Sequence, residues 1–269
     1  MRQIKSLSVL NAISFLIPAG LFYTIHLQVL NIGTARDISI PYHSLLIPPK
    51  EITLIIWGVL YTALAIFCLY HIIMAFTHRE KYPANQDTRR VDMFFIINNL
   101  AATGWVLTTA LNQLITSLIL LGFQIILISV IHRELNIYKR YRRMRSTFCT
   151  QAPMSIYAAW LSFLFMGGIS EFFRLNTAGW HPVLVGILIF ITLLVIFIRH
   201  NIVFGLMIIP GLVGIISNTD AIVKDSGSII IVAWAGIWIL ALASFVKLVM
   251  DFRLKEPPVV FQRTAMIKT

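Results

Sequence analysis

The stretch PPKEITLIIWGVLY (residues 48–61) places two prolines and two charged residues directly before an apolar run. Proline is well tolerated in the first turn of a helix, where its missing N–H costs no hydrogen bond. Glu51 lies near this expected N-terminus and complements the helix dipole. The stretch therefore predicts the start of a helix. It also places Trp57 and Tyr61, which are four residues apart, on one face of that helix.

The whole chain has the composition of a membrane protein. Its 269 residues are 58% hydrophobic and 12% charged, and the mean hydropathy is +0.83, whereas soluble domains carry about 25% charged residues. We therefore expect an all-α, polytopic transmembrane bundle of about eight helices, because eight apolar segments could each cross about 30 Å of hydrocarbon. The segments lie at about residues 7–29, 52–76, 92–111, 114–131, 152–172, 182–198, 201–217 and 228–249.

The basic residues fall on one side of these segments. If the N-terminus is inside, all but four of the 22 Lys and Arg residues lie in inner segments; the exceptions are Arg36, Lys50, Arg174 and Lys224. This asymmetry follows the positive-inside rule and predicts that both termini are cytoplasmic. The net charge of +11 then requires no nucleic acid as a partner.

One inner loop is especially basic. It reads KRYRRMR over residues 139–145. Such a cluster serves as a topology signal, and it can also bind anionic lipid headgroups. The sequence leaves both interpretations open for Lys139, Arg140, Arg142, Arg143 and Arg145.

The expected spans hold few groups that could perform acid–base chemistry. No charged residue lies at the centre of a span, and no His, Cys or carboxylate cluster has metal-ligand spacing. No nucleophile–base set can be assigned either. The sequence therefore favours a protein that is not an enzyme and has no metal site, with an intramembrane enzyme as a weaker alternative.

Aromatic and neutral polar side chains are present in the spans instead. Trp57, Trp105 and Trp234 each lie about 10 Å below the expected outer end of a helix. Buried indole N–H groups need a hydrogen-bond partner. Three tryptophans at a similar depth are typical of an aromatic pocket between helices, but also of a deep aromatic belt or of ordinary helix packing.

Four motifs then point to a known family. The first motif, at the start of the second apolar segment, consists of Pro49, Trp57, Gly58 and Tyr61. The next two are NNLAATGW (residues 98–105) and PMSIYAAW (residues 153–160), and the fourth, a partial match, is AWAGIW (residues 233–238). In this order they resemble the TspO/MBR family of tryptophan-rich sensory proteins, also called translocator proteins, and its longer bacterial relatives in particular. Two positions depart from the family pattern: Leu54 replaces an aromatic residue, and Gly168 lies near an expected asparagine.

The resemblance implies a five-helix bundle with a pocket capped by the loop at residues 30–50. It implies porphyrin (including haem) or sterol ligands, and a bacterial inner membrane. The expected organisation is a TspO-like bundle at residues 1–173, three additional transmembrane helices at 174–250 and a cytoplasmic tail at 251–269. The sequence leaves a homodimer open.

We therefore expect a multi-pass protein that binds a hydrophobic or aromatic small molecule within the membrane, as a sensor or carrier. The alternative is a facilitative transporter of a neutral solute, with helix breaks at Pro18 and Pro210. In the expected pocket, indoles stack on the ligand, while Asn98 and the tyrosines form hydrogen bonds. The expected lining residues are Trp57, Tyr61, Asn98, Trp105, Tyr157, Trp160 and Trp234.

Overall fold

The computed structural model describes residues 2–26, 46, 48–137, 146–173, 180–218 and 227–253. In these residues the secondary structure is entirely helical, which confirms the predicted fold class. The elements are α1 (Arg2–His26), α3 (Lys50–Thr77), α4 (Pro83–Ala110), α5 (Leu114–Glu134), η1 (Thr147–Gln151), α7 (Ala152–Phe172), α8 (Trp180–Arg199), α9 (Ile202–Asn218) and α10 (Gly227–Arg253).

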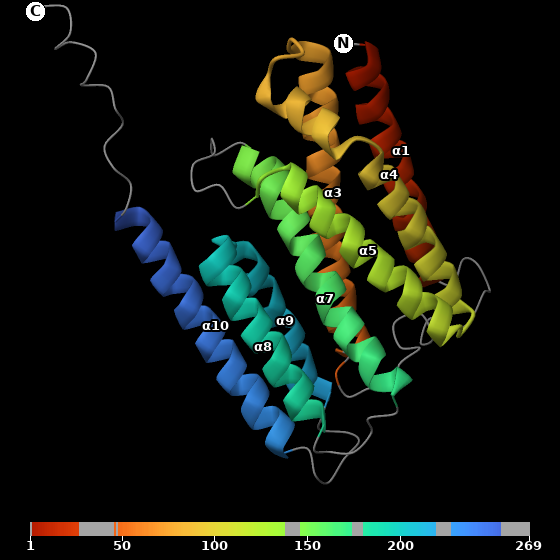
Figure 1. Ribbon diagram of the computed structural model, residues 1–269. Helices are drawn as coiled ribbons and strands as arrows, with labels where there is room; N and C mark the ends of the chain where they lie inside the picture. The colour runs from red at the N-terminus through yellow and green to blue at the C-terminus, as the bar shows by residue number, and fades with distance from the viewer. Residues whose placement is uncertain are drawn as a thin grey trace, which may run out of the picture.

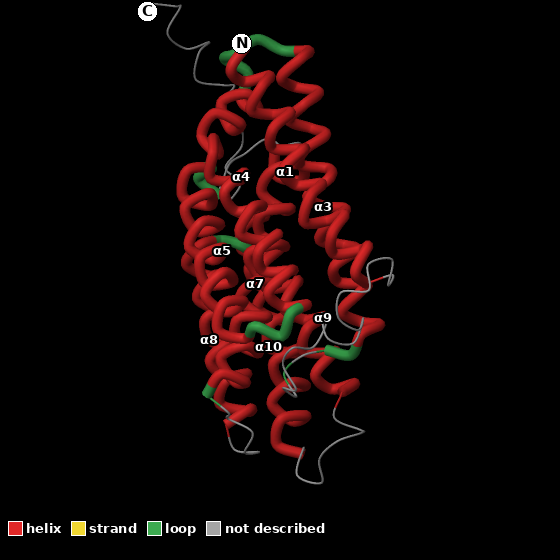
Figure 2. The backbone as a smooth tube through the Cα atoms, turned by 90° about the vertical axis from the view of Figure 1, so that its right-hand side faces the viewer, coloured by secondary structure: helices red, strands yellow, loops and turns green. Residues whose placement is uncertain are grey.

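The helices have the dimensions of membrane spans. Of those described, seven are long and apolar enough to cross a membrane, and α9 is an eighth apolar helix of 17 residues. They run along a common direction (Figure 2). Large apolar side chains such as Ile55, Leu100 and Phe190 are exposed on the outside of the bundle. Such a surface suits lipid rather than water, and the chain is therefore an integral membrane protein.

The start of α4 differs from the sequence expectation. α4 begins at Pro83 rather than near residue 92, because Pro83 is the first helical residue and the polar turns that follow continue the helix. Hydrophobicity alone cannot locate such an end, since these turns are not apolar. α7 begins at Ala152, as expected, and the π-helical turn η1 precedes it.

The α8–α9 connection is a tight hairpin, as expected from the short separation of the two apolar segments. His200 adopts a positive φ of 54°, a conformation in which His is enriched among non-glycine residues. The side-chain oxygen of Asn201 then accepts a hydrogen bond from the N–H of Phe204 at 3.2 Å. This bond satisfies one of the free donors at the start of α9.

α7 lies at the centre of the bundle. It packs against α3, α5, α8 and α9 (Figure 1), and most of its side chains are buried. Small residues on the facing helix allow this close packing. A Cβ atom at Gly211 of α9 would lie 2.7 Å from Cδ2 of Phe163 in α7, which is well inside van der Waals contact.

Pro48 and Pro49 contribute to helix packing as well as to the start of α3. Pro49 caps α3 in an extended conformation, and the side chain of Thr53 donates a hydrogen bond to the carbonyl of Pro48 at 3.0 Å. Pro48 itself rests on α9, where a Cβ at Gly214 would lie 2.6 Å from its Cγ. The start of α3 is thus fixed against α9.

A buried histidine joins three elements. His71 of α3 forms hydrogen bonds through Nδ1 to Thr88 Oγ1 of α4 at 2.8 Å and through Nε2 to Thr150 Oγ1 of η1 at 3.2 Å. Both ring nitrogens therefore have partners. His71 is a structural link in this fold.

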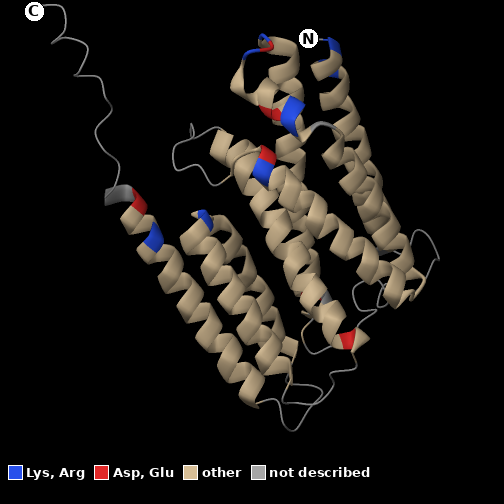
Figure 3. Ribbon diagram, viewed as in Figure 1, with Lys and Arg blue, Asp and Glu red and all other residues tan. Residues whose placement is uncertain are grey.

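The described Lys and Arg residues gather towards the end of the bundle where α1 begins (Figure 3). We call this the basic end. The basic loop at 139–145, most of the proposed capping loop at 30–50 and most of the tail at 251–269 lie outside the described residues.

Candidate functional site

Trp57 lies at the centre of a cluster of aromatic rings. Its ring centroid is 4.8 Å from that of Phe22, 5.2 Å from Tyr61, 5.6 Å from Trp105 and 6.2 Å from Trp160. The rings of Tyr61 and Trp105 are stacked on it, at interplanar angles of 27° and 28°. We call these five residues, together with Phe15, the aromatic cluster.

Four helices contribute to this cluster. Trp57 and Tyr61 are one turn apart on α3, so both project from the same face. α4 supplies Trp105 and α7 supplies Trp160, whose ring stacks on Phe163 with an interplanar angle of 9°. α1 contributes Phe15 and Phe22. Every ring of the cluster is buried.

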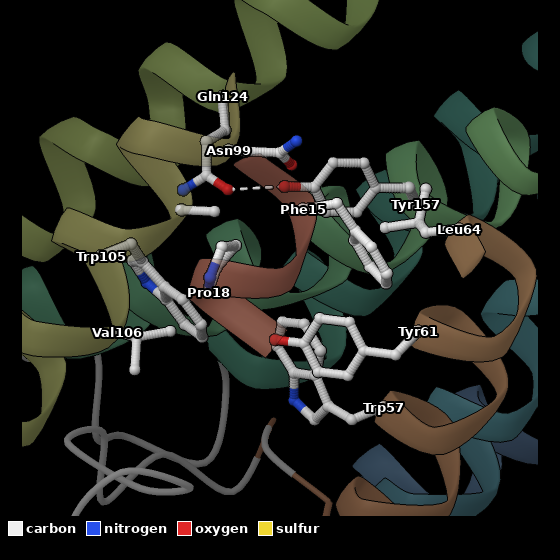
Figure 4. Close-up of a pocket in the computed structure, with 11 residues that line it drawn as sticks. Phe15, Pro18, Trp57, Tyr61, Leu64, Asn99, Trp105, Val106, Gln124 and Tyr157 are labelled. Atoms are coloured by element: carbon white, nitrogen blue, oxygen red, sulfur yellow. Dashed lines mark hydrogen bonds between the residues drawn. The ribbon is translucent and has the colours of Figure 1, made fainter. Parts of the chain in front are cut away.

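A small cavity adjoins the rings (Figure 4). Its volume is about 10 Å³, close to the minimum of about 10–15 Å³ that a single water molecule requires. It is therefore far too small for a porphyrin in this conformation. The lining residues are Phe15, Pro18, Trp57, Tyr61, Leu64, Asn99, Ala102, Trp105, Val106, Gln124 and Tyr157.

One side of the cavity is polar. The hydroxyl of Tyr157 accepts a hydrogen bond from Asn98 Nδ2 at 3.0 Å and donates one to Gln124 Oε1 at 2.9 Å. The second of these bonds is visible in Figure 4. Asn99 Nδ2 donates to Ser14 Oγ at 3.0 Å and so ties α4 to α1. These hydrogen bonds link four helices around the cavity.

Three polar atoms near the cluster lack a protein partner. They are the indole nitrogens of Trp105 and Trp160 and the side-chain oxygen of Asn98, and all three are buried. A buried polar atom without a hydrogen bond is costly. Of these three residues, Trp105 lines the cavity.

Six of the seven residues expected in the pocket come together. Trp57, Tyr61, Trp105 and Tyr157 line the cavity. Asn98 and Trp160 do not line it, but Asn98 donates a hydrogen bond to Tyr157, and Trp160 packs edge-on against Trp57.

Trp234 is the seventh and lies elsewhere. It is 48% exposed on α10, and Trp238, one turn further along the same face, is 70% exposed. Both indoles therefore lie on the outer surface of the bundle rather than in the cavity. Of the three indoles expected at one depth, Trp57 and Trp105 line the cavity and Trp234 does not, because depth does not determine which face of a helix turns inward.

Other lining residues were not expected from the sequence. Phe15 and Pro18 come from α1, and Asn99 and Gln124 come from α4 and α5. Gln124 had a usable signal, because it is an amide in the middle of a span that is otherwise apolar. Phe15 had no such signal, because it is one of 18 phenylalanines in the chain.

We expect Tyr157→Phe to lower stability. The change deletes the hydroxyl that joins Asn98 to Gln124 and leaves Asn98 Nδ2 and Gln124 Oε1 without this partner, at a cost of about 1–3 kcal/mol. Thermal unfolding in detergent would measure it. Tyr23→Phe is the matched control, because Tyr23 is partly exposed; equal melting temperatures for the two variants would contradict the role given to the hydroxyl.

The described residues contain no group of three or more His, Cys, Asp or Glu side chains that could hold a metal ion. The candidate site is an aromatic cavity with a hydrogen-bonding wall. Its chemistry suits stacking on a flat ligand and hydrogen bonding to a few polar atoms.

Comparison with known proteins agrees with this architecture. A family model described as TSPO-like protein matches residues 8–246. The match runs through the aromatic cluster and also through α8, α9 and most of α10. No curated protein and no solved structure matches the chain. Because the matched residues cover most of the sequence, the chain belongs to the family of TSPO-like proteins.

Proposed function

We propose that this membrane protein binds a hydrophobic, aromatic small molecule of the porphyrin or sterol kind at the aromatic cluster, as a sensor or carrier. The observation that carries the proposal is the cavity beside the stacked rings of Trp57 and Trp105. The buried indole N–H of Trp105 has no partner there. Membership of the TSPO-like family supports the same site.

Binding requires the cluster to open. Pockets for small molecules usually measure about 300–1,000 Å³, whereas this cavity measures about 10 Å³. The stacked pair of Trp57 and Trp105 offers a route, because a flat ligand that enters between the rings replaces ring–ring stacking with ring–ligand stacking. Each indole therefore remains stacked in the complex, which offsets much of the cost of opening.

α1 is the element best suited to move. Pro18 lies inside this helix and lines the cavity. Because proline has no N–H, the carbonyl of Ser14 loses its helical hydrogen bond, and the helix can bend at this point. Phe15 and Phe22 lie on either side of Pro18, so a bend would carry both rings away from Trp57 and Tyr61.

A sensor needs the cluster to open to one side of the membrane only, whereas a carrier needs it to open to both sides. We infer that the basic end faces the cytoplasm, since Lys and Arg are enriched there (Figure 3). Counterflow of a labelled porphyrin in proteoliposomes separates the two roles.

The binding test is quenching of tryptophan fluorescence by a porphyrin in detergent, with the Soret absorbance as a second readout. We expect saturable binding by the wild type. Trp57→Phe and Trp105→Phe are each expected to weaken the apparent affinity about tenfold, which corresponds to the removal of one indole–ligand interaction of about 1.4 kcal/mol. Trp238→Phe is the matched control, because Trp238 is exposed on α10.

Linear quenching that is the same in all four proteins would contradict the proposal. It would mean that the porphyrin only partitions into the detergent micelle. Saturable binding that Trp238→Phe weakens as strongly as Trp57→Phe would place the ligand on the outer surface of α10 instead.

A further inference from the structure

A second hollow lies at the basic end, far from the aromatic cluster along the helices. Its volume is about 310 Å³, at the lower limit of about 300 Å³ for small-molecule sites. Unlike the aromatic cavity, it has polar or charged side chains at all but one of its lining positions. The lining residues are Ile4, Glu80, Lys81, Asn85, Gln86 and Arg89.

The charges at this hollow favour an anion. Lys81 and Arg89 contribute two positive charges against the single carboxylate of Glu80. The Arg89–Glu80 pair is loose, with 3.6 Å between Nη1 and Oε1 and side chains that are 70% and 49% exposed. Such exposed pairs contribute little to stability, so a phosphate can engage the guanidinium of Arg89 at little cost.

Asn85 adds a requirement that a simple anion does not meet. Its side chain is fully buried, and Nδ2 donates to the carbonyls of His78 at 3.2 Å and Arg79 at 3.0 Å. These bonds fix the orientation of the amide. Its Oδ1 is then left without a partner. A fixed, buried acceptor calls for a ligand that brings a hydrogen-bond donor.

The hollow also adjoins apolar surface. Ile4 of α1 forms part of its wall, and the neighbouring Lys5 places its ammonium 4.9 Å from the ring centroid of Phe76 in α3. Phe76 is exposed on the outside of the bundle, as is Ile73 one turn earlier. Polar and apolar surfaces thus meet here, as they do at the surface of a bilayer.

We propose that this hollow binds a phosphate ester that carries a hydrogen-bond donor, such as the headgroup of an amine- or hydroxyl-bearing phospholipid. Lys81 and Arg89 hold the phosphate through charge-assisted hydrogen bonds. The donor of the ligand, an ammonium or a hydroxyl, binds Asn85 Oδ1. The same chemistry fits a soluble phosphate ester, and the experiment distinguishes the two sources.

The test is native mass spectrometry of the full chain with phosphatidylethanolamine, phosphatidylglycerol or phosphatidylcholine of identical acyl chains. The first two lipids have donors beyond the phosphate, and phosphatidylcholine has none. We expect the wild type to retain either donor-bearing lipid at least about fivefold better than phosphatidylcholine, as one hydrogen bond to a buried acceptor allows.

The double variant Lys81→Ala/Arg89→Ala is expected to lower this retention about tenfold. The matched control, Arg79→Ala/Arg133→Ala, removes the same charge from positions that do not line the hollow, and retention should change less than about twofold. All four side chains are exposed, so neither variant should impair folding.

Soluble phosphoethanolamine identifies the source of the ligand. If it displaces the bound lipid at millimolar concentration, the hollow recognises the phosphate ester alone; if the lipid stays bound, its acyl chains contribute. Equal losses in the two double variants would overturn the proposal, because the effect would then be one of net charge. Equal retention of all three lipids would overturn it as well, because Asn85 would then select nothing.

Discussion

Trp57→Ala is expected to destabilise the protein by at least about 2 kcal/mol, as large-to-small changes at buried aromatic residues do. Trp57 is only 4% exposed and contacts four other rings. Truncation leaves a void among rings from α1, α3, α4 and α7. In a bilayer these packing contacts matter more than transfer from water, because lipid is itself apolar.

This expectation changes the interpretation of Trp57 that the sequence suggests. From the sequence, Trp57 is expected to line the pocket and to stack on the ligand. With four ring contacts on one indole, the substitution affects both, and Trp57→Phe becomes the better probe of binding.

The measurement is thermal unfolding of purified protein in detergent, in which size-exclusion chromatography monitors the loss of folded protein. Trp238→Ala is the matched control, since it deletes the same side chain from an exposed position; its melting temperature should lie within a few degrees of the wild type. If Trp238→Ala lowers the melting temperature as much as Trp57→Ala, the aromatic cluster is not a packing centre.

Gly211→Ala is the second substitution with a large expected effect. Alanine is a better helix former than glycine by about 1 kcal/mol, so a position without close neighbours should gain stability. At Gly211 the new Cβ would lie 2.7 Å from Cδ2 of Phe163 and closer still to Cε2. Phe163 stacks on Trp160 and has little room to move, so overpacking should cost about 1–3 kcal/mol.

Gly186→Ala is the control for this prediction. Gly186 is also inside a helix, α8, but a Cβ there would have no atom within 4 Å. We expect the melting temperature to rise or stay unchanged for Gly186→Ala and to fall by several degrees for Gly211→Ala. An increase for both variants would show that α9 can shift away from α7 without loss.

The sequence was a good guide to the helices and to part of the site. The apolar runs located each span to within a few residues, except where polar turns extend a helix, as at the start of α4. Pairs such as Trp57 and Tyr61 were correctly placed on one helix face. The partners of those faces were not predictable: Phe15 and Pro18 on α1, and Gln124 on α5, join the cavity only through the packing of helices that are distant in sequence.

The sequence by itself determined that this chain is a membrane-spanning helical bundle with one basic end. Hydrophobic length and charge are properties of each segment alone, and the bilayer selects on both. Only the tertiary structure decided which face of each helix turns inward. Lipid and the bundle interior are both apolar, so hydrophobicity does not distinguish them. Trp57 and Trp234 therefore look alike in the sequence, yet one is buried at the centre of the aromatic cluster and the other lies on the outer surface of α10.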